Sequence, residues 1–296
     1  MELTNDYKQK VVEHLMIARK NFDGVDTVFA KQYGINNSVF SRIRKGETEK
    51  LLSVTQWLTI GRKLGVVLNE RKWNIAKTDV FAMIEEDVLF CKEYSKSRIF
   101  VDECEIGKTV AAKYLSRNLK NCFYVDASQA TTKQRFIRLL ARTIGLDETG
   151  KYLDVLDNIK QYLPLLEKPV VIIDEAGDLD FPAFTELKGL WNATENACAW
   201  YLIGADGLRS KIEKGIANKK VGFKEIFSRF SSNYSSIVPT EKHERQDFYR
   251  SLITSVLSVN TPKGKDISPI VTKCLIERNG KIGGLRRAES LLILNS

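Results

Sequence analysis

The feature that most constrains the fold of this 296-residue chain is an alternation of two segment types between residues 95 and 240. Short apolar stretches typical of strands are followed by longer stretches whose apolar residues recur at helical spacing. Such alternation predicts a parallel sheet with helices on both faces. The expected strands are Ser97–Val101, Cys122–Asp126, Val170–Asp174, Trp200–Gly204 and Ser236–Pro239. The expected helices are Thr109–Leu119, Thr132–Ile144, Tyr152–Leu166, Phe181–Glu195 and Gly207–Ile216.

The segments on either side of this alternation read as helices without strands. Residues 7–68 hold short helical stretches, and residues 241–296 hold further ones. The polar stretch 69–80 reads as a linker that leads into a helix at Thr78–Tyr94. We therefore expect an N-terminal helical domain at 1–70, a linker and lead-in helix at 71–95, an α/β core at 96–240 and a helical domain at 241–296.

The N-terminal part contains the pattern FAKQYGINNSVFSRIRKG, in which a helix, a tight turn at Gly34 and a short basic helix follow one another. This is the order of a helix-turn-helix, whose second helix enters the major groove of DNA. The segment resembles the helix-turn-helix domains of the lambda-repressor kind. In that resemblance the residues that face DNA are Asn37, Ser38, Ser41, Arg42 and Lys45. Val39 and Ile43 are expected to face inward, and a helical packing domain with a solvated basic helix is the alternative.

The formal net charge of +9 is distributed unevenly along the chain. Residues 1–80 hold 14 Lys and Arg against 9 Asp and Glu, residues 81–240 hold 22 against 22, and residues 241–296 hold 10 against 6. A polyanion that contacts both ends of the chain fits this pattern. Duplex DNA is such a partner, and an ordinary solvated surface is the alternative.

The sharpest chemical signal is the tripeptide Gly107-Lys108-Thr109, which follows the first expected core strand and opens the next helix. A helix N-terminus in this context presents unpaired N–H groups to phosphate, so the pattern predicts a nucleotide-binding loop. The lysine would reach the outer phosphates, and the threonine hydroxyl would ligate Mg²⁺. The residues expected around the cofactor ATP in this loop are Ile106, Gly107, Lys108, Thr109 and Val110.

The loop departs from the pattern G-x-x-x-x-G-K-[ST] at its first position, where this chain has Asp102. Glu103 and Glu105 add two more carboxylates. Three negative charges beside a triphosphate are unfavourable unless the side chains point away. The sequence leaves open whether these residues slow hydrolysis.

A second signal lies downstream, where the apolar run 170–173 ends in Asp174-Glu175. A buried strand followed by two acids is typical of ATPases. Asp174 would hold Mg²⁺ through water, and Glu175 would orient and polarise the attacking water. The alternative, a strand that happens to end in two acids, is disfavoured by the order of the two motifs.

With these two motifs, the chain resembles the AAA+ ATPases over roughly residues 76–296. The resemblance implies an α/β P-loop core with a parallel sheet flanked by helices, a small helical lid, and here an all-α helix-turn-helix domain in front. Asp206 is the candidate for the polar residue called sensor 1, because Ala205 stands at its usual position. Arg229 resembles an arginine finger, which reaches the γ-phosphate held by a neighbouring subunit, and Arg286 resembles the sensor 2 arginine. For each arginine alone, a surface ion pair is the alternative.

The helix-turn-helix narrows the resemblance to the transposition target-selection ATPases, the group of the phage Mu B protein and of related transposon and insertion-sequence helper ATPases. That resemblance implies an ATP-dependent homo-oligomer, a helical filament or a ring, which assembles on duplex DNA and directs a transposase. Two other functions stay open. One is a helicase-loader-like replication ATPase, and the other is a DNA-binding regulator that senses ATP without hydrolysing it.

Other classes of function find less support in the sequence. The five scattered cysteines form no CxxC pair, so neither a zinc ribbon nor a disulfide framework is expected. No apolar run approaches the roughly 18 residues of a membrane helix, and the polar start lacks the apolar core of a signal peptide. A cytoplasmic protein is therefore expected.

Overall fold

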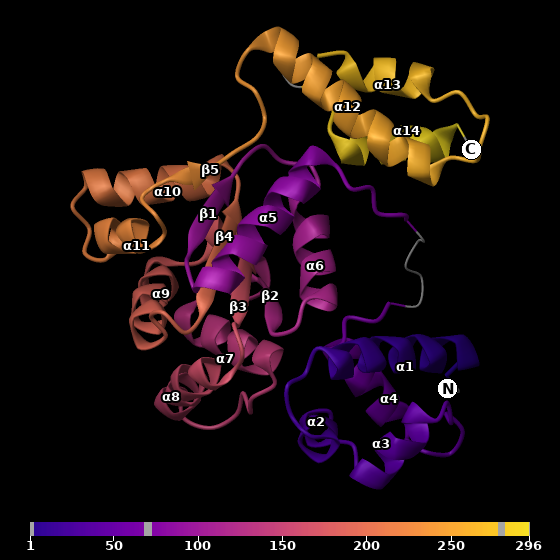
Figure 1. Ribbon diagram of the computed structural model, residues 1–296, viewed down its shortest axis with the longest axis vertical. Helices are drawn as coiled ribbons and strands as arrows, with labels where there is room; N and C mark the ends of the chain where they lie inside the picture. The colour runs from indigo at the N-terminus through magenta and orange to yellow at the C-terminus, as the bar shows by residue number, and fades with distance from the viewer. Residues whose placement is uncertain (1–2, 68–72, 278–281, 296) are drawn as a thin grey trace.

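The computed structural model describes residues 3–67, 73–277 and 282–295. At its centre lies a five-stranded sheet in the order β2-β3-β4-β1-β5, whose neighbouring strands are all parallel (Figure 1). The strands are β1 Arg98–Val101, β2 Cys122–Asp126, β3 Val170–Asp174, β4 Ala199–Gly204 and β5 Tyr234–Ser235. The α/β class predicted from the alternation of segments is therefore confirmed.

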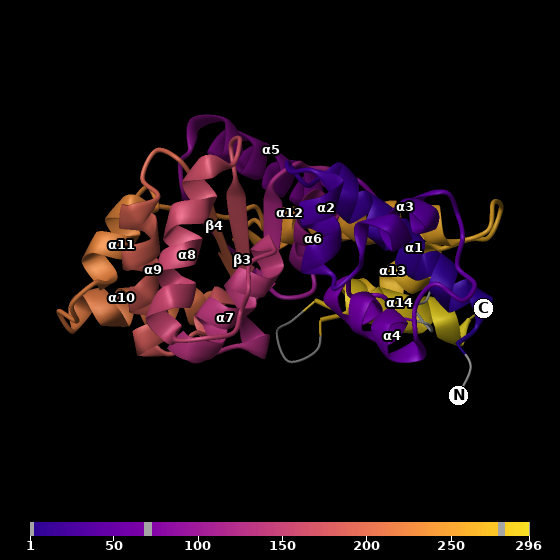
Figure 2. The same ribbon diagram turned by 90° about the horizontal axis from the view of Figure 1, so that it is seen from below.

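Helices cover both faces of the sheet (Figure 1, Figure 2). One face carries α5 (Asp79–Tyr94) and α6 (Lys108–Asn118). The other face carries α7 Lys133–Ile144, α8 Tyr152–Tyr162, α9 Phe181–Ala193, α10 Asp206–Ala217 and α11 Phe223–Arg229. Successive residues of β3 serve opposite faces, because Val171 packs with the second group and Ile172 with the first. A strand covered on both sides must be apolar at successive positions, which explains the run 170–173.

The N-terminal helices build an apolar cluster of their own. These helices are α1 Asn5–Lys20, α2 Asp26–Gln32, α3 Asn37–Arg44 and α4 Val54–Lys63. Tyr7, Val11 and Leu15 recur every four residues along α1, so they lie on one side of the helix and are buried. They share the cluster with Trp57 and Ile60 of α4.

The turn at Gly34 and the short basic helix α3 lie where the sequence predicts them. Gly34 has a φ of +68°, and the side chain of Asn36 accepts a hydrogen bond from the Ser38 N–H to start α3. Of the two residues expected to face inward, Ile43 is fully buried, and Val39 is partly buried and packs against the same apolar cluster. Phe40, which was not part of this expectation, is also fully buried.

The C-terminal helices pack into the apolar cluster that contains α5 and α6. They are α12 Lys242–Asn260, α13 Ser268–Leu275 and α14 Leu285–Leu294. In Figure 1 they stand together at one end of the sheet layer, beyond α5 and α6. Across the described residues, none of the helices combines the length and the apolar character needed to cross a bilayer.

Two elements differ from the sequence-based expectation. The last strand is Tyr234–Ser235 rather than Ser236–Pro239. The N–H groups of Ile237 and Val238 instead donate to a side-chain carboxylate, as described below. The sequence also does not predict α11 as a helix, because its seven residues are too few to show a clear period.

Candidate nucleotide-binding site

The loop of residues 102–107 connects the end of β1 to the first turn of α6. Gly107, at the N-cap of α6, has a φ of +101°, a conformation that favours glycine. No side chain caps this end of the helix. The first N–H groups of α6 therefore point toward the loop without an intrahelical acceptor, as an anion-binding helix start requires.

Lys108 is 9 % exposed and turns into this loop. Its Nζ donates hydrogen bonds to the backbone carbonyls of Asp102, at 2.8 Å, and of Glu103. Burial lowers the pKa of Lys108 below its ordinary value, while nearby acids, Asp174 and Glu175 among them, favour its charged form. The loop thus holds an ammonium group at the start of α6.

Asp174 joins the end of β3 to the start of α6. It is 2 % exposed, and its Oδ2 accepts hydrogen bonds from Thr109 Oγ1 at 2.7 Å and from Tyr124 Oη at 2.9 Å. A carboxylate beside a threonine hydroxyl is an all-oxygen donor pair of the kind Mg²⁺ takes together with phosphate. These two predicted ligands therefore fit the ion. Tyr124 was not predicted, and its one signal is its place on β2, next to β3.

Glu175 follows directly and is exposed. Its backbone adopts a φ of +51°, which is uncommon for a residue other than glycine. Although the residue as a whole is exposed, neighbouring protein atoms partly desolvate its carboxyl group, and this desolvation, followed by the charge of Asp174, raises the pKa of Glu175 above its ordinary value. A carboxylate with a raised pKa beside a phosphate-binding loop is suited to accept a proton from water.

Asp102, at the position where the loop pattern has glycine, bonds through its carboxylate to backbone N–H groups outside α6. Asp102 is 7 % exposed, and its Oδ1 accepts a hydrogen bond from the Glu103 N–H at 2.7 Å. Its Oδ2 accepts from the N–H groups of Ile237 at 2.6 Å and Val238 at 3.0 Å. Backbone N–H groups therefore stabilise the negative charge of Asp102, and its carboxylate is not directed at a phosphate.

The other two loop carboxylates also have partners in the protein. Glu103 Oε2 accepts from Arg245 Nη2 at 2.8 Å and from Tyr249 Oη at 2.7 Å. Glu105 Oε1 lies 3.9 Å from Arg286 Nη1. The repulsion expected from three unpaired carboxylates in the loop is thus relieved by pairing, and the candidate sensor 2 arginine stands beside the loop.

Three further predicted residues surround the loop less directly. Ile106 is fully buried, and Val110 is 47 % exposed on the first turn of α6. Both side chains are apolar, so only their backbone N–H groups can bind phosphate. Asp206 is exposed at the first position of α10. It follows β4 closely, and the Gly204 carbonyl at the end of that strand accepts from the Asp102 N–H at 3.4 Å.

The structure does not bring Arg229 to the phosphate loop of its own chain. Arg229 ends α11, which lies on the opposite side of the sheet from α6 (Figure 1, Figure 2). Its Nε donates to Asn192 Oδ1 at 2.9 Å, and its guanidinium lies 5.2 Å from the centre of the Trp191 ring. Arg229 therefore lies apart from the phosphate loop of its own chain.

The predicted DNA-facing residues form a separate group on α3. Ser41 is partly exposed, and the four exposed members are Asn37, Ser38, Arg42 and Lys45. Arg42 pairs with Glu47 at 2.7 Å. The outer face of α3 is thus polar and basic, opposite its buried side.

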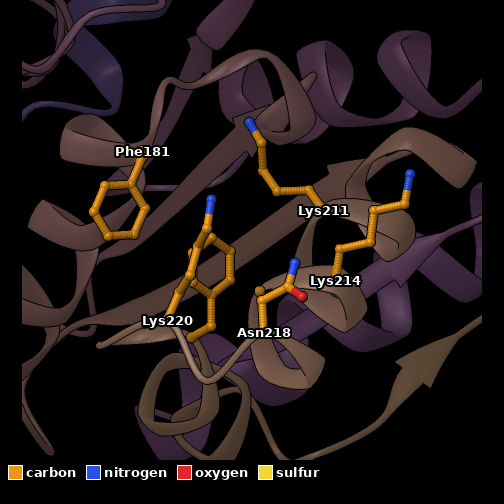
Figure 3. A pocket seen from close by; sticks show the side chains of 7 residues that line it. Phe181, Lys211, Lys214, Asn218 and Lys220 are labelled. Atoms are coloured by element: carbon orange, nitrogen blue, oxygen red, sulfur yellow. The ribbon is translucent and has the colours of Figure 1, made fainter.

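A second basic region lies between α9, α10 and α11. A hollow of about 230 Å³ opens there, and Figure 3 shows Lys211, Lys214 and Lys220 around it together with Phe181. Lys220 Nζ lies 5.7 Å from the centre of the Phe181 ring. Lys211 is half-buried at the base, where its Nζ donates to backbone carbonyls.

This region is more basic than the sequence around it. Residues 206–229 hold seven Lys and Arg against three Asp and Glu, although residues 81–240 as a whole are balanced. The exposed lysines Lys214, Lys219, Lys220 and Lys224 are here called the α10–α11 basic surface.

The fold and the site together define a phosphate-binding α/β domain of the P-loop kind. A family model described as an AAA domain matches residues 92–212, which include the loop, Asp174 and Glu175. This part of the chain is therefore similar to AAA domains. A search of curated protein sequences gives no significant match to the chain.

Proposed function

We propose that this protein is an ATPase that assembles on duplex DNA and directs a transposase to target sites. The observation that carries the ATPase part is the hydrogen bond between Thr109 and Asp174, at 2.7 Å, within the AAA-type domain. It joins the residue after the loop lysine to the acid that ends β3. The proposal keeps the division into an N-terminal helical domain, an AAA core and a helical lid.

Each loop residue has a definite task in ATP hydrolysis. Bound ATP would supply the reactive phosphoryl group, and Mg²⁺ would offset the negative charge of the phosphates. The N–H groups at the start of α6 and the Lys108 ammonium bind phosphate oxygens, while Thr109 and Asp174 would hold the metal ion. Glu175 orients the attacking water and accepts its proton. Arg286, beside the loop, binds phosphate from the lid side.

The position of Arg229 supports assembly into an oligomer. Because α11 faces away from the phosphate loop of its own chain, Arg229 acts on the nucleotide of a neighbouring copy. An ATP site completed by two subunits favours a ring or a helical filament. The Asn192 and Trp191 contacts hold the guanidinium in place on α9.

DNA binding is shared by two surfaces in this proposal. The exposed face of α3 contacts the duplex as the second helix of a helix-turn-helix. The α10–α11 basic surface binds backbone phosphates without reading bases. Replacing Lys214 and Lys220 together by Ala is expected to weaken DNA binding about tenfold and to lower the salt dependence by about two counterions. Lys96→Ala, an exposed lysine outside both surfaces, is the matched control.

The pairing of the loop carboxylates favours hydrolysis over mere ATP sensing. Asp102, Glu105 and Ala205 were the features that supported a disabled site. The Asp102 carboxylate accepts from the N–H groups of Ile237 and Val238, and Glu105 Oε1 lies 3.9 Å from Arg286 Nη1, so neither acid faces the triphosphate without a partner. The helicase loader stays the second candidate, because it uses the same core.

The test combines assembly with partner activity. Wild type and Glu175→Gln are incubated with ATP and random-sequence duplex DNA, and complexes are followed by sedimentation and electron microscopy. We expect ATP-dependent assemblies that persist longer in Glu175→Gln. A cognate transposase is then assayed for strand transfer near the bound protein. Helicase loading in place of stimulated strand transfer would overturn the transposition role.

A further inference from the structure

The loop that is expected to bind phosphate also holds the C-terminal helices. Asp102 contacts the segment that leads to α12, since its Oδ2 accepts from the N–H groups of Ile237 and Val238. These donors lie 135 and 136 residues further along the chain. Glycine at position 102 has no side chain and cannot make this contact.

A second attachment joins the loop to α12 itself. Glu103 Oε2 accepts from Arg245 Nη2 and Tyr249 Oη, which lie four residues apart and so on one side of the helix. Tyr249 is 2 % exposed. Because Glu103 accepts charge-assisted hydrogen bonds from both an arginine and a buried tyrosine, the position of α12 relative to the loop is fixed in direction and distance.

A third attachment joins the loop to the start of α14. The Glu105 carbonyl accepts from the Leu285 N–H at 2.9 Å. The approach is close enough to require glycine next to it, because a Cβ on Gly284 would lie 2.5 Å from Glu105 Cβ. The next residue of α14 is Arg286, whose Nη1 lies 3.9 Å from Glu105 Oε1.

We propose that this loop is the anchor of the C-terminal helices, and that Asp102 and Glu103 are positioning residues that set where Arg286 stands relative to Lys108. This inference rests on the proposed ATPase function, because it assigns Arg286 a phosphate to bind. The carboxylate that replaces the first loop glycine is in this view a functional part of the site. A shift of the loop backbone on nucleotide binding is passed to the lid through the three attachments.

The test is a double-mutant cycle between Asp102→Asn and Arg286→Ala. Asn keeps the size of Asp102 but loses the charge and one acceptor, so the N–H groups of Ile237 and Val238 hold it less firmly. ATP affinity is measured for the four proteins with a fluorescent ATP analogue. We expect Arg286→Ala to weaken binding about tenfold in the wild-type background and less than about threefold in the Asp102→Asn background.

Two further measurements separate positioning from general loss of structure. Hydrogen exchange at residues 234–241 is expected to speed up in Asp102→Asn, while exchange in β3 stays as in wild type. Glu103→Gln, which keeps the shape of the side chain, is carried through the same cycle in case Asp102→Asn folds poorly. Glu93→Gln, which breaks a surface pair with Lys168, is the control and should be additive with Arg286→Ala.

The outcomes distinguish this inference from the proposed function. Wild type that fails to bind ATP would contradict the ATPase proposal. Wild type that binds ATP, with equal effects of Arg286→Ala in all backgrounds, would overturn the anchor alone. An Arg286→Ala variant that binds ATP as wild type does would overturn it as well.

Discussion

The phosphate loop and the basic helix α3 treat their polar side chains in opposite ways. In the loop, Asp102, Glu103 and Lys108 all bond within the protein, in part to residues more than a hundred positions away. On α3 most polar side chains face solvent, and the ion pair of Arg42 spans only five positions, to Glu47. A site with internally fixed charges is pre-organised for one small ligand, whereas an open basic face suits a polyanion of variable shape.

The largest effect is expected from Glu175→Gln, which removes the proposed catalytic carboxylate beside the phosphate loop. Gln cannot accept the proton of the attacking water, so turnover should fall about 100-fold or more. ATP affinity should change little, because the loop contacts of Lys108 and Thr109 are kept. Single-turnover hydrolysis and an ATP-binding titration measure the two effects. Normal hydrolysis in this variant would remove Glu175 from its assigned role.

The pH dependence of turnover is a second test of the role of Glu175. Burial and Asp174 raise the pKa of Glu175, so it stays protonated to a higher pH than an ordinary glutamate. Because the carboxylate form accepts the proton, turnover should fall on acidification at a pH above the usual value of 4.5. A pH–rate profile, with folding checked by circular dichroism at each pH, measures this. An acid limb at or below 4.5 contradicts the shift.

A charge reversal on α3 tests whether this helix binds DNA. Lys45 is exposed at the end of the basic helix, so Lys45→Glu should repel backbone phosphates and weaken duplex binding about tenfold. ATP binding in the absence of DNA should stay unchanged, since α3 contributes nothing to the loop. Fluorescence anisotropy with labelled duplex gives the affinity. Unchanged DNA affinity would favour the packing-domain interpretation of α1–α4.

The smallest effect is expected from Glu47→Gln, which frees Arg42. Surface ion pairs contribute at most about 1 kcal/mol, so the free energy of unfolding should change little. DNA affinity should rise about twofold, because a negative charge is lost next to the binding face. Denaturant melts and anisotropy measure the two quantities. A fall in DNA affinity would show that the pair orients Arg42 rather than restraining it.

The same contrast explains what the sequence can and cannot predict. Strands β2 and β3 match their expected bounds, because each is a compact apolar run with a polar end. Thr109 and Asp174 are hydrogen-bonded, because the sheet topology brings the end of β3 next to the start of α6. These parts of the fold and site depend on short-range pattern.

The roles of the loop carboxylates depend on contacts between residues far apart in the sequence, so short-range sequence patterns do not predict them. Asp102 looks unfavourable in sequence because its donors, Ile237 and Val238, lie in a segment without any motif. The same bonds explain the misplaced last strand, since those N–H groups are not available to a neighbouring strand. On α3, Phe40 is fully buried in addition to Ile43, while Val39 packs against the same cluster only in part, because packing decides how deeply adjacent apolar residues are buried.

The most direct test of the central claim is ATP turnover by the purified protein, with and without random-sequence duplex DNA, beside Lys108→Ala. We expect turnover that rises when DNA is added and disappears in the variant, because the loop ammonium is required for phosphate binding. Absence of turnover in wild type under both conditions, or full turnover in Lys108→Ala, would contradict it.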